Sequence, residues 1–308
     1  MEFSNFKSGF VSIIGKPNVG KSTLLNKFIG EKLSIISPKP QTTRSNIKGI
    51  YNTTDAQIIF IDTPGFLEPR YELQEKMLSY IIESIKNSDL LIYVCDASDF
   101  PSEYDDKVLN IIKKSKQLCI CIINKTDLIN SSQITILKDK LLSSELDIFN
   151  NDNLFFCSAL SEKVYADNQQ QNINVILQKI ITYLPYNPPL YDQENLSDLP
   201  MRFFAQEIIR EKIFLYYDKE IPYSTTVVVE KWSEEENRDV IQATIWIERD
   251  SQKPIIIGKQ GKMIGKVRQE SEMDISTLTG KKAVLNLWVK VKYDWRKKNG
   301  ALHEFGYK

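Results

Sequence analysis

Short apolar runs alternate with segments of helical periodicity through residues 1–183. The runs lie at residues 9–14, 56–62, 89–97, 117–124 and 153–159, and segments such as 21–30 and 134–146 separate them. Near-continuous apolar strands indicate a sheet that is buried on both faces. Strands that alternate with helices indicate right-handed crossovers and a mostly parallel sheet. The first part of the chain is therefore predicted to be an α/β domain with helices on both faces of its sheet.

The pattern changes type after a predicted helix at 173–184. The stretch "PYNPPLYDQENLSDLP" is dense in Pro, Asn and Asp, which is typical of a linker. Beyond it we expect a helix at 201–217, strands at 224–232, 239–248 and 283–293, and a glycine loop followed by a helix before the last strand. This order predicts a smaller α+β domain with helices on one face of a mixed or antiparallel sheet. The predicted division is 1–183, a linker at 184–200, and 201–308.

Composition narrows the class of protein. The chain has 308 residues, enough for two domains, and its 40 Lys and Arg balance 40 Asp and Glu. Charge is uneven, however, because twelve basic residues face four acidic ones between Lys253 and Lys298. The four cysteines lie in or beside apolar runs without metal-like pairing, which favours reduced core thiols in a cytoplasmic protein. No run approaches the ~18 apolar residues of a membrane span, so a soluble protein is expected.

The stretch "GKPNVGKS", residues 15–22, lies between a predicted strand and a predicted helix. It fits the phosphate-binding pattern G-x-x-x-x-G-K-[ST] in the context that the pattern requires. Glycines allow backbone N–H groups to surround phosphate oxygens at a helix N-terminus. Lys21 would neutralise the β- and γ-phosphates, and the Ser22 hydroxyl would bind Mg²⁺.

A second polar motif, "DTPG", ends the apolar run at 56–62. Ligands bind at the carboxyl ends of parallel strands, so Asp62 is the expected anchor for Mg²⁺ and the Gly65 N–H can contact the γ-phosphate. The polar stretch at 37–46 between the two motifs suits a loop that becomes ordered when a threonine reaches the metal. We select Thr43, with Thr42 as the alternative.

The base is identified by "NKTD", which ends another apolar strand. The Asp127 carboxylate can accept from N1–H and the exocyclic amine of guanine, and adenine would leave it unpaired. Asn124 would connect this loop to the phosphate loop, Lys125 would pack over the base, and the Ala159 N–H would reach guanine O6. The nucleotide is thus expected to contact Gly15, Lys16, Pro17, Asn18, Val19, Gly20, Lys21, Ser22, Thr23, Asp62, Thr63, Pro64, Gly65, Phe66, Asn124, Lys125, Thr126, Asp127, Ser158, Ala159 and Leu160.

Phe66 stands where Ras-like GTPases have the glutamine that orients water, and phenylalanine cannot do this. Hydrolysis must therefore depend on positioning by Lys21, Thr43 and Gly65, on Mg²⁺, and on another positive charge. The sequence resembles translation-factor-related GTPases with a hydrophobic residue there, several of which use K⁺ held by an asparagine of the phosphate loop. That resemblance gives the hypothesis that Asn18 is a K⁺ ligand. Slow intrinsic turnover is expected.

A second glycine loop, "GKQGKMIG" at 258–265, does not meet the requirements of the first. Two residues separate its first glycines, and Lys262 is followed by Met263 rather than by a hydroxyl. It matches the G-x-x-G loop of KH domains, which clamps about four nucleotides of single-stranded RNA. The expected RNA-binding residues are Ile257, Gly258, Lys259, Gln260, Gly261, Lys262, Lys266 and Arg268.

Taken together, "GKPNVGKSTLLNK", "PQTTR", "DTPGF", "NKTDL", "CSAL", "IIIGKQGKMI" and "LNLWVKVKYDWRKKN" resemble the Era family of bacterial GTPases over nearly the whole chain. The resemblance implies a P-loop GTPase domain followed by a type II KH domain. It implies binding of GTP and of the 3′ end of 16S rRNA, and a role in assembly and maturation of the small (30S) ribosomal subunit. It also implies a monomer in the cytoplasm with peripheral contact to the inner membrane.

The polar run at 162–174 departs from the family pattern and is predicted to be a surface insertion. Two other functions stay open. One is an RNA-binding structural protein that retains GTP without turnover. The other is a nucleotide kinase, although no acceptor pocket or arginine-rich lid is evident in the sequence.

Overall fold

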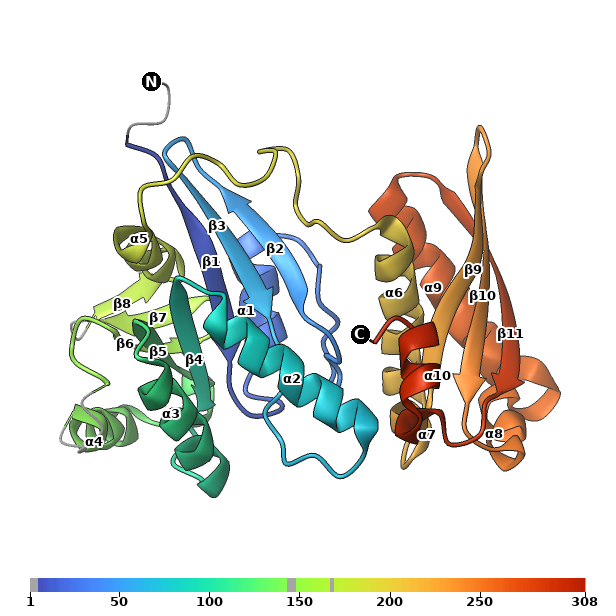
Figure 1. The fold of residues 1–308 in the computed structure, drawn as a ribbon, viewed down its shortest axis with the longest axis horizontal. Helices are drawn as coiled ribbons and strands as arrows, with labels where there is room; N and C mark the ends of the chain where they lie inside the picture. Colours follow the sequence, from blue (N-terminus) through green and yellow to red (C-terminus); the bar gives the residue numbers. More distant parts are fainter. Residues whose placement is uncertain (1–4, 143–147, 167–168, 308) are drawn as a thin grey trace. The chain divides into compact units, whose positions relative to one another are not determined.

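The computed structural model describes residues 5–142, 148–166 and 169–307, which divide into two compact units (Figure 1). The first unit comprises Met1–Ser34, Thr43–Glu68 and Met77–Asp198. The second comprises Ile35–Thr42, Pro69–Lys76 and Leu199–Lys308. None of the helices in the described part combines the length and the apolar character needed to span a bilayer.

The first unit is built on one sheet with the strand order β2-β3-β1-β4-β5-β6-β7-β8. The strands are β1 (Lys7–Ile14), β2 (Ile47–Asn52), β3 (Ala56–Asp62), β4 (Leu90–Asp96), β5 (Cys119–Asn124), β6 (Leu154–Ser158), β7 (Lys163–Ala166) and β8 (Gln169–Asn172). The five central strands, from β3 to β6 in the sheet order, pair in parallel. The predicted mostly parallel sheet is confirmed.

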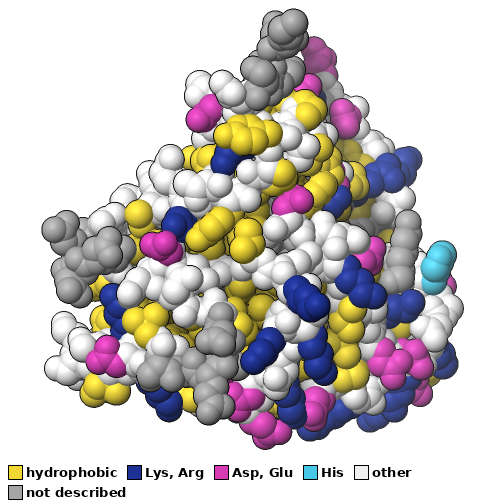
Figure 2. Space-filling view, turned by 60° about the vertical axis from the view of Figure 1, so that its left-hand side comes forward, with side chains coloured by type: hydrophobic (Ala, Val, Ile, Leu, Met, Phe, Trp, Pro, Cys, Tyr) yellow, Lys and Arg dark blue, Asp and Glu magenta, His cyan; other side chains and the backbone are white. Residues whose placement is uncertain are grey.

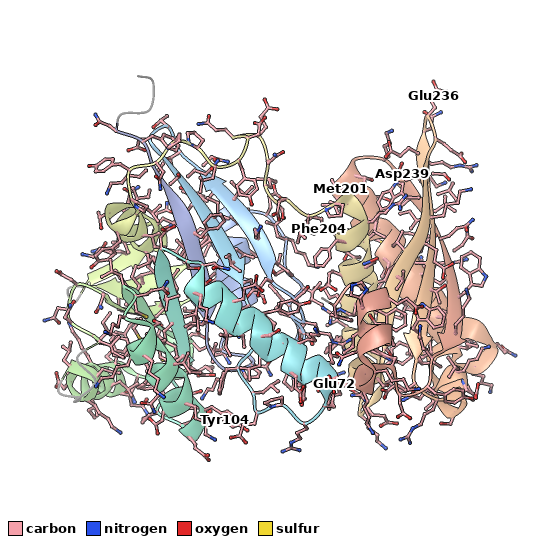
Figure 3. The ribbon with its side chains drawn as sticks, in the orientation of Figure 1. Glu72, Tyr104, Met201, Phe204, Glu236 and Asp239 are labelled. Carbon is pink, nitrogen blue, oxygen red and sulfur yellow. The ribbon has the colours of Figure 1, made fainter. Side chains whose placement is uncertain are left out.

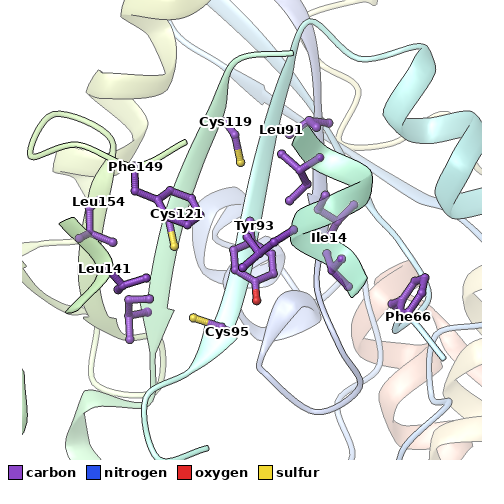
Figure 4. Packing of buried hydrophobic residues seen from close by; sticks show 14 of the residues in the cluster. Ile14, Phe66, Leu91, Tyr93, Cys95, Cys119, Cys121, Leu141, Phe149 and Leu154 are labelled. Carbon is purple, nitrogen blue, oxygen red and sulfur yellow. The ribbon is translucent and has the colours of Figure 1, made fainter. Parts of the chain in front are cut away.

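Helices cover both faces of this sheet. They are α1 (Lys21–Ile29), α2 (Glu72–Lys86), α3 (Glu103–Ser115), α4 (Ser131–Leu142) and α5 (Asn174–Tyr183). On one face, Ile81 of α2 and Leu109 of α3 pack in a buried cluster with Tyr93 of β4 (Figure 4). On the other face, the ring of Phe28 in α1 stacks on Phe60 of β3 with centroids 5.0 Å apart. The end of the predicted helix at 134–146 lies outside the described residues.

Three strands were not predicted from the sequence. β2 is an antiparallel edge strand beside β3, and its sequence "IKGIYN" has no regular alternation. The polar run at 162–174 contains β7 and β8, an antiparallel pair that extends the sheet beyond β6. Val164 is fully buried there, so the run is part of the sheet and not only a surface insertion. Its polar composition concealed the strands because β8 reads "QQQN".

The stretch at 185–198, predicted as part of the linker, is held against the first unit. Ser8 Oγ donates to the Pro188 carbonyl at 2.7 Å. The fully buried Gln57 accepts from the backbone N–H groups of Leu190 (2.7 Å) and Tyr191 (2.9 Å) and donates to the Tyr191 carbonyl (2.9 Å). These hydrogen bonds satisfy backbone N–H and C=O groups of the stretch. Residues 188–191 are therefore fixed to the first unit and do not form a flexible linker.

The second unit has a mixed sheet of three strands in the order β11-β10-β9. Its elements are α6 (Met201–Tyr216), α7 (Ile221–Ser224), β9 (Thr226–Glu234), β10 (Arg238–Ile247), α8 (Lys253–Ile257), α9 (Lys262–Thr279), β11 (Lys282–Val291) and α10 (Asn299–Glu304). Ile209 of α6 and Ile275 of α9 are buried with Ile245 of β10. Glu236 lies at the tip of the β9–β10 hairpin (Figure 3). The predicted α+β arrangement is confirmed.

Residues 35–42, which include most of the polar stretch at 37–46, belong to this second unit. Lys39 Nζ donates to the Phe214 carbonyl at 2.8 Å and to the Asp218 carboxylate at 2.8 Å. The Ile36 N–H donates to the buried carboxylate of Glu211 at 3.2 Å. Nothing in the sequence pattern indicated these contacts.

Candidate nucleotide site and nucleic-acid interface

The loop between β1 and α1 places a buried ammonium at the start of the helix. Lys21 is the first residue of α1 and follows Gly20, whose φ of 100° is the left-handed conformation that glycine adopts readily. Lys21 Nζ donates to the Lys16 carbonyl at 2.9 Å. Burial lowers the pKa of Lys21 to about 8, although the charge of Asp62 opposes the shift. The backbone N–H groups of the helix start and this ammonium form an anion site.

Lys16 lies in the same loop, but its side chain is directed to other groups. Its ammonium is bound by the Asp99 carboxylate (2.8 Å), the Asp99 carbonyl (3.1 Å), Ser102 Oγ (3.2 Å) and the Asp105 carboxylate (3.3 Å). Burial opposes the charge of Lys16, but the hydrogen bond to Asp99 and the charge of Asp105 outweigh burial and raise its pKa. Of the expected nucleotide contacts of Lys16, only those of its backbone fit this geometry.

Three oxygen-bearing side chains converge beside Lys21. Ser22 Oγ donates to Asp62 Oδ2 at 2.6 Å, and Thr43 Oγ1 lies 3.0 Å from Ser22 Oγ and 3.5 Å from Asp62 Oδ2. Asp62 is fully buried, and its other oxygen, Oδ1, has no hydrogen-bond partner among the described residues. Burial raises the pKa of Asp62, and the charge of Lys21 opposes the shift. A buried carboxylate oxygen without a partner beside two hydroxyls is a donor set that suits a hard cation.

Thr42 is placed differently from Thr43. Its hydroxyl donates to the Lys39 carbonyl at 2.7 Å. The geometry therefore favours Thr43 over Thr42 as the residue that completes the oxygen cluster.

Gly65 touches the phosphate loop. A Cβ at this position would lie 2.7 Å from both Cα and N of Pro17. The Phe66 N–H donates to the Gly15 carbonyl at 3.0 Å, and the Phe66 ring is 8% exposed within the cluster of Figure 4. Because the ring is packed in the core, it cannot act on a water molecule, as the sequence predicts.

The base-reading motif is tied to the phosphate loop by Asn124. Its Nδ2 donates to the Val19 carbonyl at 2.7 Å, which is the connection that the sequence predicts. Its Oδ1 accepts from the Ala159 N–H at 2.9 Å. The N–H that we expected to meet guanine O6 is thus used inside the protein, because the amide of Asn124 bridges both loops. Asp127 is exposed and available to a base.

The second glycine loop connects α8 to α9. Gly258 has φ of 72°, and a Cβ on it would lie 2.6 Å from Cγ of Met263, so glycine is favoured and any other residue would have to displace Met263. Lys259, Gln260 and Lys262 are exposed, which leaves their side chains accessible to a ligand. Elsewhere, on the face in Figure 2, acidic and basic side chains are interspersed, in keeping with 40 of each. The excess of basic residues lies in the segment Lys253–Lys298, which contains this loop.

Known protein families match the two units of the chain separately. A family model described as 50S ribosome-binding GTPase matches residues 10–125, and a KH domain model matches residues 220–296. GTPase Era of Caldicellulosiruptor saccharolyticus is 43% identical over 305 residues, which cover 98% of each chain. GTPase Era of Ruminiclostridium cellulolyticum is 40% identical over 308 residues, covering 99% of this chain and 98% of the relative.

The chain belongs to the Era family of GTPases.

Solved structures agree with this membership. The crystal structure of Era in complex with MgGDPNP and nucleotides 1506–1542 of 16S ribosomal RNA matches with a TM-score of 0.91 and 35% identity, covering 98% of this chain and 99% of that one. A variant of Aquifex aeolicus Era bound to GDP·AlF4⁻ matches with a TM-score of 0.91 and 34% identity, with the same coverage. This Era-family protein is a GTPase with a C-terminal KH domain, and the fold and activity predicted from the sequence are confirmed.

Several residues that support the site of this Era-family GTPase were not predicted. Asp96, at the end of β4, forms an ion pair with Lys125 at 2.7 Å, and Lys125 lowers the pKa of Asp96 against the effect of burial. A carboxylate at the carboxyl end of a buried strand was visible in the sequence as "VCDA". Asp99 and Asp105, which hold Lys16, gave no comparable signal because they follow the strand in a loop and a helix.

The remaining predicted residues differ in burial and in the groups that they contact. Thr63 Oγ1 donates to the Ile13 carbonyl at 2.8 Å and so joins β3 to β1. Ser158 is buried, whereas Leu160 is 79% exposed. Lys266 lies 3.8 Å from the centroid of the Tyr216 ring, which restrains its ammonium near α6.

Proposed function

We propose that this Era-family GTPase is a GTP-hydrolysing switch whose KH domain binds the 3′ end of 16S rRNA during assembly of the 30S subunit. The observation that carries the proposal is the presence, in one chain, of a complete oxygen-and-lysine nucleotide site and a G-x-x-G loop with exposed cations. The relative solved with MgGDPNP and a 16S rRNA fragment, similar over 98% of this chain, supports the same ligands here.

Mg²⁺ fits the oxygen cluster of the nucleotide site. Ser22, Thr43 and Asp62 would hold it, and the unpartnered Oδ1 of Asp62 is available toward it. A bound Mg²⁺ neutralises phosphate charge. Lys21 supplies the second positive charge, from a buried position where electrostatic effects are strong. The carbonyl of Lys16, which now accepts from Lys21, would be exchanged for phosphate oxygens when the nucleotide binds.

Guanine selectivity would come from Asp127, whose carboxylate is exposed and can accept two hydrogen bonds from the base. Asn124 fixes the distance between this loop and the phosphate loop by bonding to Val19. Lys125 is held by Asp96 and so presents its aliphatic stem at a defined place. A purine without the two guanine donors leaves the carboxylate unpaired, which lowers its affinity.

Hydrolysis in this protein would proceed without orientation of water by residue 66, because that residue is a phenylalanine and its ring is buried. Positioning by Gly65 and Thr43 and positive charge from Lys21 and the metal would supply the rate enhancement. Asn18 is exposed in the phosphate loop and has a φ of 64°. We retain K⁺ bound by Asn18 as the source of a further charge.

The family description names the 50S particle, whereas the structural relative was solved with RNA of the small subunit. We favour the small subunit because the second likeness spans both domains and includes the KH loop. We also propose that the protein is a cytoplasmic monomer with peripheral contact to the inner membrane, as in its family.

The experiment that tests this function measures phosphate release from GTP with and without an RNA that carries the 3′ end of 16S rRNA, together with RNA affinity. We expect slow release by the wild-type protein and altered release with RNA. Lys21→Ala should abolish nucleotide binding and leave RNA affinity intact. Gly258→Asp combined with Gly261→Asp should do the reverse, because two carboxylates would face the RNA phosphates.

The outcomes separate the rival functions. A protein that releases no phosphate in either condition would be a GTP-retaining RNA binder. Full RNA affinity in the double aspartate variant would exclude the G-x-x-G loop as the RNA-binding site, and co-sedimentation with 50S rather than 30S particles would exclude the assigned subunit.

A further inference from the structure

The sheet of the KH unit has two faces of different character. The face that packs on α6 and α9 carries Ile241, Ile245 and Leu285, all fully or almost fully buried. Figure 1 shows α6 and α9 on the same side of this sheet. Because side chains alternate along a strand, the residues between the buried ones point to the opposite face.

The parallel register of β10 and β11 fixes which side chains are neighbours on that opposite face. Successive rows pair Val240 with Val284, Gln242 with Asn286, Thr244 with Trp288, and Trp246 with Lys290. β9 adds Lys231 beside Gln242 and Val228 beside Thr244. We call the rows from Val240 to Trp288 the outer sheet face.

The C-terminal tail covers only the end of the sheet next to this face. The Phe305 ring packs on Trp246 with centroids 5.5 Å apart, and Tyr307 Oη lies 3.2 Å from Thr226 Oγ1. Trp288, in the adjoining row, is 43% exposed. A large indole at this exposure, in the row next to Gln242 and Asn286, is a surface that a partner would cover.

The groups around Trp288 favour a nucleic acid as that partner. The side chains of Asn286, Lys231 and Lys290 are exposed and can bind base edges and phosphates. The neighbouring carboxylate of Glu230 accepts from Thr244 Oγ1 at 2.6 Å and lies 3.5 Å from Lys290 Nζ, so its charge is partly compensated. Aromatic rings on a sheet, flanked by amides and cations, stack unpaired bases in several RNA-binding folds.

β11 contributes to the outer sheet face and also contacts both helices that flank the G-x-x-G loop. β11 is the edge strand of the sheet, and both α8 and α9 contact it from the buried side. An RNA strand bound to the loop would reach Trp288 by passing round the edge of β11, from the helix side of the sheet to its outer side. The loop itself accommodates about four nucleotides, so a longer strand has bases left to place.

We propose that the outer sheet face is a second RNA-contact surface, on which Trp288 stacks a base of the same strand that the Gly258–Gly261 loop clamps. The proposal rests on the RNA binding proposed above and extends it. Lys231 and Lys290 contact the phosphates on either side of the stacked base.

The test uses two single-stranded oligoribonucleotides from the 3′ end of 16S rRNA, one of about four nucleotides and one of about twelve. Trp288→Ala should weaken binding of the longer RNA about tenfold and leave the shorter one unchanged. Trp288→Phe, which keeps an aromatic ring, should retain most of the affinity. The matched control is Ile136→Ala, which truncates an apolar side chain that is 65% exposed on α4.

Fluorescence gives a second readout. The longer RNA should quench tryptophan emission of the wild-type protein, and Trp288→Ala should remove that quenching. Equal affinity and unchanged emission would overturn the proposal. Equal weakening of both RNAs would also overturn it, because the substitution would then act on the fold. If the wild-type protein bound neither RNA, the proposed function would fail instead.

Discussion

The Lys16 ammonium provides a direct test of how the phosphate loop is held. Substituting Lys16→Met keeps the length of the side chain and removes its charge. The fully buried carboxylate of Asp105 then loses its cationic partner, which lies 3.3 Å away. The substitution leaves the Gly15–Ser22 motif otherwise unchanged, so any effect reports the connection to α3.

The magnitude follows from what Asp105 retains. Its carboxylate still accepts from Tyr93 Oη (2.7 Å), the Ser102 N–H (2.9 Å) and Ser102 Oγ (2.6 Å). Breaking a buried ion pair costs about 3–5 kcal/mol, and these three bonds place the expected loss at about 3 kcal/mol. Asp105→Asn removes the orphaned charge, so Lys16→Met with Asp105→Asn should lose less than the two single losses added together.

The tryptophans make the assay specific. All four, Trp232, Trp246, Trp288 and Trp295, lie in the second unit. In urea denaturation, tryptophan fluorescence follows that unit, whereas far-UV circular dichroism follows both. Lys16→Met should shift the transition that dichroism detects and fluorescence does not.

The control is Lys107→Met, which removes an exposed lysine paired with Glu68 and Glu103 on the same unit. Exposed pairs contribute little, so no resolved shift is expected. The reasoning would be refuted if Lys16→Met lost no more stability than this control, or if the tryptophan transition moved with it.

Three further predictions concern the nucleotide site. The pKa of Lys21 is lowered to about 8, and phosphate requires its ammonium. GDP affinity should therefore fall about tenfold between about pH 8 and pH 9, below the range in which guanine loses its N1 proton, and Lys21→Arg should abolish this fall. Flat affinity of the wild-type protein up to about pH 9 would contradict this. Gly65→Ala should slow turnover about a hundredfold because its Cβ would displace Pro17, whereas Gly265→Ala, with open space around it, should not. If Asn18 holds K⁺, turnover should be faster in KCl than in NaCl, and Asn18→Ala should remove the difference; equal wild-type rates exclude the ion.

The parts of the fold that could be predicted are those that a short stretch of sequence identifies by itself. β1, β3, β4 and β5 are short apolar runs, and burial on both faces leaves little choice of residue. β8 is held by backbone pairing at a sheet edge, where side-chain type matters less, so "QQQN" gave no signal. The docking of residues 185–198 uses Ser8 and Gln57, single polar residues inside apolar strands, and isolated residues are too few to constitute a pattern.

The nucleotide site divides in the same way. Asp62 and Asn124 end buried strands, so topology alone brings them together at one edge of the sheet. The use of the Ala159 N–H by Asn124 depends on how closely two loops approach, which neither loop specifies by itself. The exposure of Trp288 was equally hidden, because a tryptophan on a strand is buried or exposed according to register and to what covers its face.

Lys16 and Lys21 show most clearly that a local sequence motif does not specify the environment of each side chain. They are separated by four residues of one loop, and the motif assigns a role to the second alone. What distinguishes them is the environment: Lys21 faces Asp62, whereas Lys16 faces a carboxylate eighty-nine positions away on α3. The two ammonium groups therefore have different roles. Lys21 would bind phosphate, and Lys16 fixes the loop that binds it. The position of α3 determines that Lys16, and not Lys21, is held by Asp105. That position is set by the packing of the whole sheet.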